Sequence, residues 1–164
     1  MRNVRFTRHA SESGTMAERR FSAIVLEQGW HGYTPEVVTG VDYIVETEKG
    51  GLKKVQITIG SPDPNATTKR RGYVVAKPTD RIRKDVDVLA IFIDRHWFLI
   101  PIAAYKTDGF LQSYNTNTPT FYVNIDRLKP PMSNAHNAWW VFEQRNLNTP
   151  TVINKFLKKI KVSA

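Results

Sequence analysis

An acidic residue and a group of polar residues lie in two alternating segments of this sequence. Asp42 is near the start of the first segment, Gln56 and Thr58 are in the second, and a Gly50–Gly51 pair separates the segments. A Gly-Gly pair between segments of period-2 alternation predicts a β-hairpin over residues 41–59. Because side chains alternate between the faces of a strand, the Asp42 carboxylate and the Gln56 and Thr58 side chains can converge.

This pattern resembles the PD-(D/E)XK nuclease superfamily, in which an Asp opens one strand and a Glu or Gln lies two residues before a Lys on the next. It is most similar to small homing endonucleases associated with group I introns, where the second run reads roughly Val-Gln-Val-Lys. Here the run reads Val55-Gln56-Ile57-Thr58, so a threonine takes the place of the motif lysine. The Ile100-Pro101 pair also resembles these relatives, and the resemblance covers residues 14 to about 105.

The resemblance implies a site-specific DNA endonuclease that uses Mg²⁺. Its implied ligands are the Asp42 carboxylate, the Gln56 side chain, the Ile57 backbone carbonyl and Glu18, which matches a glutamate on an early helix of the family. Mg²⁺ is a hard cation that prefers such oxygen ligands. Such an enzyme also implies a homo-oligomer, a dimer or tetramer, because one active site cuts one strand.

The missing lysine leaves three explanations open. Lys54, two residues before Gln56 on the same face, or a residue of the basic segment described below supplies the positive charge. Alternatively, the protein binds DNA without cutting it, or the sequence carries an inactivating change at Thr58.

Two of the implied ligands also have structural interpretations. Thr15 and Glu18 form a capping-box pattern, so Glu18 could simply cap the start of a helix. Asp42 follows Gly40 closely and could satisfy the amides of a turn. Both alternatives remain open at this point.

The chain is strongly basic, with a formal net charge of +9 and a pI near 9.9. Such a charge favours a polyanionic partner, because neutralised phosphates release counterions. Apart from Asp80, the charges of residues 69–84 are positive. The residues expected to contact DNA are Lys69, Arg70, Arg71, Arg81, Arg83 and Lys84, with Lys77 nearby. The alternative is a solvated basic face.

Composition narrows the class of protein further. The chain has 164 residues, which fits one nuclease-like domain with a core over about 14–105 and a C-terminal extension over 106–164 for oligomerisation or DNA docking. It has no cysteine, which excludes disulfides and thiolate metal sites. The basic start lacks an apolar signal region and the longest apolar run is too short to span a membrane, so we expect a cytoplasmic protein. The four histidines show no metal-ligand spacing.

These elements predict an α/β fold with a restriction-endonuclease-like core, a mixed sheet flanked by helices. Residues 1–13 are expected to form an arm or a short strand, and residues 60–72 a loop or a poorly ordered stretch. A helix that ends at Gly29 and a final helix that begins at Thr149 and Pro150 are predicted from capping signals. The other predicted elements are a helix over 15–28, strands over 86–93, 97–105 and 123–128, and a short helix over 138–143.

Two other functions remain open beside the endonuclease. A non-catalytic DNA- or RNA-binding module would account for the charge and for Thr58. An interaction domain with an incidental basic face would account for the charge alone.

Overall fold

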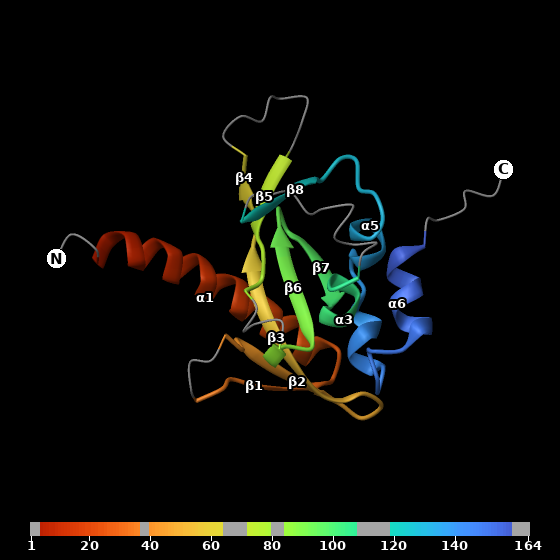
Figure 1. Cartoon of the computed structure of the whole chain (residues 1–164). Coiled ribbons are helices and arrows are strands. Elements are labelled where there is room, and N and C mark those ends of the chain that lie inside the picture. Colours follow the sequence, from red (N-terminus) through yellow and green to blue (C-terminus); the bar gives the residue numbers. More distant parts are fainter. Residues whose placement is uncertain (1–3, 37–39, 64–71, 80–83, 108–118, 159–164) are drawn as a thin grey trace.

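A five-stranded mixed sheet runs through the molecule. The structure is a computed structural model, and it describes residues 4–36, 40–63, 72–79, 84–107 and 119–158. The strand order is β1-β2-β3-β6-β7 (Figure 1). β3 and β6 are parallel, and the other neighbours are antiparallel. The strands are β1 (His31–Tyr33), β2 (Tyr43–Thr47), β3 (Gly51–Ile59), β6 (Val88–Ile93) and β7 (His96–Pro101).

A second sheet of three antiparallel strands lies beyond the end of β3 (Figure 1). Gly60 joins the two sheets, and a Cβ at this position would lie 2.7 Å from Cγ1 of Ile93. The loop predicted over 60–72 is wrong at Ser61–Pro62 and at Gly72, which lie in strands, while residues 64–71 lie outside the described part. The strands are β4 (Ser61–Pro62), β5 (Gly72–Ala76) and β8 (Thr120–Asn124).

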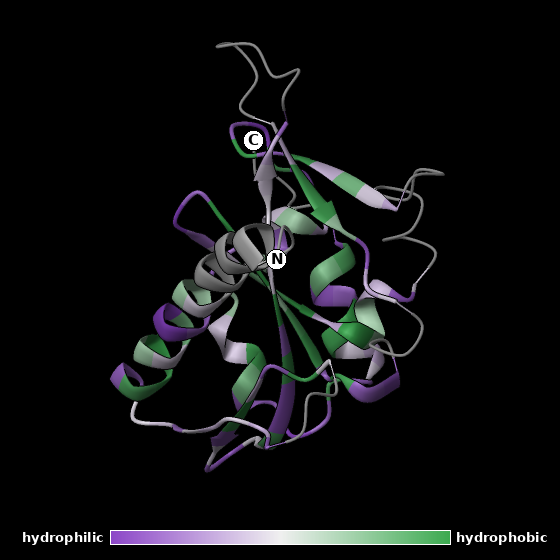
Figure 2. Cartoon of the chain, turned by 90° about the vertical axis from the view of Figure 1, so that its left-hand side faces the viewer, coloured by the Kyte–Doolittle hydropathy of each residue, from purple (hydrophilic) through white to green (hydrophobic). Residues whose placement is uncertain are grey.

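Helices cover the sheet: α1 (Val4–Glu27), α3 (Ile102–Tyr105), α5 (Met132–Ala135), α6 (Pro150–Leu157) and the 3-10 helix η1 (Trp139–Glu143). The Phe21 ring of α1 lies 5.5 Å from the Tyr43 ring of β2 and 5.3 Å from the Trp97 ring of β7. It also contacts Trp139 and Phe142, so α1 and η1 cover the same face. Figure 2 shows that the central strands are largely hydrophobic.

Every residue of β6 is buried, which requires cover on both faces of the sheet. One cluster of buried hydrophobic residues extends from Ala17 in α1 to Phe156 in α6. The mixed sheet with flanking helices confirms the predicted α/β class. Among the described residues, no helix combines the length and apolar character needed to cross a membrane.

The end of α1, the start of α6 and the hairpin confirm the predictions made from the sequence. The Trp30 amide donates to the Val25 carbonyl oxygen and the Gly29 amide to that of Leu26, the bonding of a Schellman motif, with Gly29 at φ +77°. The Thr149 side chain accepts a hydrogen bond from the Val152 amide. The hairpin predicted over 41–59 is formed by β2 and β3.

The start of α1 corrects the prediction for the N-terminal region. The helix begins at Val4, so residues 4–13 form neither an arm nor a strand, and Thr15 lies inside the helix. The capping interpretation of Glu18 is therefore wrong. Gly14 weakens a helix by only about 1 kcal/mol, which does not end one that is stabilised by packing from Ala17 onward.

Two predicted strands have different bounds. The strand predicted over 97–105 ends at Pro101, which has no amide to donate to a ladder, and residues 102–105 form α3. The strand predicted over 123–128 is β8, which ends at Asn124 because the Asn124 side chain accepts from the Asp126 amide in a local turn. The short helix predicted over 138–143 is η1, which contacts β2, β3 and β7.

Candidate metal and catalytic site

Asp42 is fixed at the start of β2 by the neighbouring strand. Its Oδ2 accepts a hydrogen bond of 2.8 Å from the Ile57 amide, and its own amide donates to the Val55 carbonyl oxygen at 2.9 Å. The carboxylate therefore bonds across the hairpin to β3. The interpretation of Asp42 as a residue that satisfies turn amides is wrong, because the amide it binds belongs to a strand.

Gln56 lies next to the bonds that Asp42 makes. The paired register of the hairpin ends at Tyr43 and Val55, and Asp42 bonds to the main chain of Val55 and of Ile57, the two neighbours of Gln56. The Gln56 Oε1 atom is buried and accepts no hydrogen bond from any described residue. Because a buried acceptor without a donor costs about 1–3 kcal/mol, this oxygen is suited to a ligand that the protein itself does not supply.

Glu18 of α1 lies near Asp42. It lies one turn before Phe21, at the border of the buried helix face, and is partly buried. Burial and, second, the charge of Asp42 raise the pKa of Glu18. Burial also raises the pKa of Asp42, while the hydrogen bond from Ile57 acts in the opposite direction. Both carboxylates are thus partly desolvated, and Glu18 is close enough to Asp42 to be repelled by it.

These donors fit a hard divalent cation. Two carboxylates and an open amide oxygen are the ligand types that Mg²⁺ takes, and a cation would relieve both the repulsion and the unpaired Gln56 oxygen. The Ile57 amide faces Asp42, so the carbonyl of that residue points to the same side of β3. The described residues contain no group of three or more His, Cys, Asp or Glu that could hold a metal, so the site depends on the amide and carbonyl oxygens.

Of the residues expected to supply positive charge or to contact DNA, only some lie in the described part of the chain. Thr58 is half-buried and lies on the Gln56 face of β3. Lys54 is exposed on the same face, about 6.6 Å along the strand from Gln56 but about 13 Å from Thr58. Lys84 is exposed just before β6. The other expected DNA contacts, Lys69, Arg70, Arg71, Arg81 and Arg83, lie outside the described residues.

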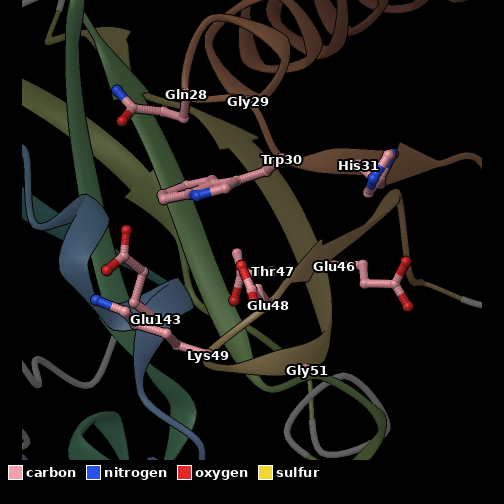
Figure 3. A pocket seen from close by; sticks show the side chains of 10 residues that line it. All are labelled: Gln28, Gly29, Trp30, His31, Glu46, Thr47, Glu48, Lys49, Gly51 and Glu143. Carbon is pink, nitrogen blue, oxygen red and sulfur yellow. The ribbon is translucent and has the colours of Figure 1, made fainter.

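A pocket of about 710 Å³ lies elsewhere, beside the hairpin turn. Figure 3 shows the Trp30 indole across it, with Glu143 and Lys49 on one side and His31 and Glu46 on the other. None of Glu18, Asp42 and Gln56 lines it. Its acidic lining is unfavourable for phosphate.

Lys53 is a charged residue that the sequence analysis missed. It is buried, with 4% of its surface exposed, on the face that it shares with Val45 and Val55. A lysine at a position with the parity of apolar residues was the signal that could have identified it.

Comparison with known proteins gives a match at the level of structure. No protein-family model matches the chain, and no curated protein matches it in sequence. The structure of a bacterial homing endonuclease, I-Ssp6803I, matches with a TM-score of 0.59 and 19% identity, over 79% of this chain and 88% of that one. Hjc, a Holliday junction resolvase from the archaeal hyperthermophile Archaeoglobus fulgidus, matches with a TM-score of 0.42 and 10% identity, over 70% and 85%. The chain therefore has the mixed α/β fold of restriction-endonuclease-like structures, as predicted.

Proposed function

We propose that this chain is a Mg²⁺-dependent, site-specific DNA endonuclease of the homing-endonuclease kind. One observation supports the proposal: Gln56, whose Oε1 is buried and unpaired, lies between the two β3 residues that bond to Asp42, and the charge of Asp42 acts on Glu18. Because the fold is shared with a homing endonuclease, a site for a phosphodiester substrate is the interpretation that fits both observations.

Asp42, Gln56, Glu18 and the Ile57 carbonyl would hold the metal. When bound, Mg²⁺ supplies charge neutralisation at the phosphate and lowers the pKa of a bound water. The Ile57 amide keeps the Asp42 carboxylate aimed, and Gln56 is the neighbouring residue of β3. The site has only two carboxylates, so a DNA phosphate is expected to complete its ligand shell.

Lys54 takes the role of the missing motif lysine in this proposal. Its side chain is exposed on the Gln56 face and is long enough to reach a phosphate at the site. Thr58 offers only a neutral hydroxyl. The residues proposed to bind the DNA backbone are Lys69, Arg70, Arg71, Arg81, Arg83 and Lys84.

A double-strand break needs two active sites, so we propose that the protein acts as a dimer or tetramer, with residues 106–164 serving oligomerisation or DNA docking. Sedimentation velocity of the full chain, free and bound to DNA, measures the assembly. A monomer at micromolar concentration, both free and bound to DNA, would contradict this part of the proposal.

The test of the site uses supercoiled plasmid and genomic DNA with Mg²⁺. Asp42→Asn should reduce cleavage by about 100-fold or more, the scale of losing one electrostatic stabiliser. The exposed Asp85 gives a matched control, and Asp85→Asn should cut like the wild type. Undiminished cleavage by Asp42→Asn would show that the site is assigned wrongly.

A second candidate, DNA binding without cleavage, is favoured by the absence of an ammonium group at Thr58. It predicts salt-sensitive binding, no Mg²⁺-dependent cutting by the wild type, and no activity in Thr58→Lys. In the endonuclease proposal, Lys54→Gln loses cleavage while it retains DNA binding. Thr58→Val is the control for loss of the hydroxyl.

A further inference from the structure

A second pocket, of about 330 Å³, lies where β3, the start of β6, α3 and residues 145–148 meet. None of Glu18, Asp42 and Gln56 lines it, so it is separate from the candidate metal site. Among the described residues that line it, one is acidic, Asp87, and four are cationic, which leaves an excess of positive charge. We call it the basic pocket, and its cationic residues are Lys53, Lys84, Lys106 and Arg145.

Lys53 is the unusual member of this group. Its ammonium is buried and donates a hydrogen bond to the Gly50 carbonyl oxygen, and within the described part of the chain no carboxylate pairs with it. Burial lowers the pKa of Lys53, and Arg145 acts in the same direction, while Asp87 opposes them. Because a buried ammonium is stabilised when its remaining donors and its charge are compensated, an anion would suit this pocket.

Asp87 supplies only part of this compensation. Its Oδ2 accepts a 2.8 Å hydrogen bond from the Lys54 amide, and its own amide donates to the Lys54 carbonyl oxygen at 2.9 Å. The carboxylate is therefore held against the edge of β3. A single carboxylate faces four cations, and Lys106 and Arg145 are exposed at the rim.

We propose that the basic pocket binds a phosphate group. Gly50 uses one of the three donors of the Lys53 ammonium, which leaves two for an oxyanion. The guanidinium of Arg145 offers paired donors that match two phosphate oxygens, and Lys84 and Lys106 add charge at the rim. The phosphate belongs either to a nucleic-acid backbone or to a free phosphate ion, and both have this chemistry.

The basic pocket lies apart from the candidate metal site. Strand alternation puts Lys53 and Gln56 on opposite faces of β3, with their Cα atoms about 10 Å apart along the strand. Phosphate binding is thus measurable whether or not the protein cuts DNA. A failure of the proposed nuclease activity leaves this proposal intact.

The experiment measures binding of inorganic phosphate by calorimetry and of a DNA duplex over a salt series. The test variant is Lys106→Gln with Arg145→Gln, since both side chains are exposed and the fold should persist. The matched control removes two exposed cations outside both the pocket and residues 106–164, Arg19→Gln with Arg95→Gln. A second variant, Lys53→Met, removes the buried ammonium and keeps most of its volume.

The pocket variant should weaken phosphate binding by at least about tenfold, the effect of losing one charge-assisted contact, while the control stays within about twofold. If DNA supplies the phosphate, the slope of log K against log salt should fall by about 0.9 for each lost contact. Weaker phosphate binding with an unchanged slope would identify a free phosphate ion. If phosphate affinity and salt slope match those of the control in the pocket variant, the proposal is overturned, even if Lys53→Met does not fold.

Discussion

Substitution of Asp42 by Asn and by Ala should change stability in different ways. Asn keeps an oxygen for the Ile57 amide, which now donates to Asp42 at 2.8 Å, whereas Ala leaves this amide without its acceptor. An unpaired, partly buried amide costs about 1–3 kcal/mol. In a chain of 164 residues, where 1 kcal/mol shifts the Tm by about 2–4 °C, Asp42→Ala should melt about 2–12 °C below Asp42→Asn.

The pH dependence of the free energy of unfolding shows whether the charge of Asp42 stabilises or destabilises the folded protein. Burial raises the pKa of Asp42 above its ordinary value of 3.8, so the folded state binds this proton more tightly than the unfolded state. The free energy of unfolding therefore falls as pH rises from 3.8 through the raised folded pKa. Without metal at pH 7, Asp42→Asn should be more stable than the wild type, and this advantage should disappear below pH 3.8.

Mg²⁺ should reverse that order. At a concentration of 100 times its Kd, the ion stabilises the wild type by about 2.7 kcal/mol, or about 5–11 °C in Tm, and it should stabilise Asp42→Asn much less. Thermal unfolding followed by circular dichroism, in EDTA and in Mg²⁺ from pH 3 to 8, measures all three effects. An equal Mg²⁺ shift in wild type and Asp42→Asn, or a less stable Asp42→Asn at pH 7 in EDTA, would refute the reasoning.

Three further predictions concern single positions. Gln56→Leu removes a buried oxygen that lacks a donor, so the free energy of unfolding in EDTA should rise by about 1–3 kcal/mol. The melting temperature should rise with it, and the stabilisation by Mg²⁺ should vanish. A lower melting temperature in EDTA would contradict this. Gly50→Ala should unfold at lower urea than Gly51→Ala, because a Cβ at position 50 would clash with the Phe142 carbonyl oxygen whereas position 51, at φ +71°, has no atom within 4 Å; equal midpoints would count against this close approach of the turn to η1. Burial and, second, the charge of His96 lower the pKa of His136 below 6.5. The free energy of unfolding should therefore fall as pH drops from 6.5 through the lowered pKa of the folded state, and His136→Gln should make this pH dependence flatter.

The sequence predicts those parts of the candidate site that follow from the alternation of side chains along the two strands of the hairpin. Asp42 and Gln56 could be assigned because a hairpin is a local structure and its parity is set by few residues. The stop at Gly29 and the cap at Thr149 are also local signals. Each of these elements is determined by neighbours a few positions away in the chain.

The rest depends on contacts between distant segments. β5 pairs with β8 across more than 40 residues, and both strands are five residues long, so neither shows a clear period. Thr15 and Glu18 match a capping box, yet packing of the Ala17 and Phe21 side chains carries the helix past this point. Lys53 shares the basic pocket with residues 145–148, which come from a distant part of the chain.

The clamp on Asp42 is made by main chain. Every amino acid except proline offers the same N–H at position 57, so the identity of that side chain is free to change while the acid stays aimed. Sequences could therefore diverge widely around this point and keep one orientation of the carboxylate. Proline at position 57 is the single replacement that would release it.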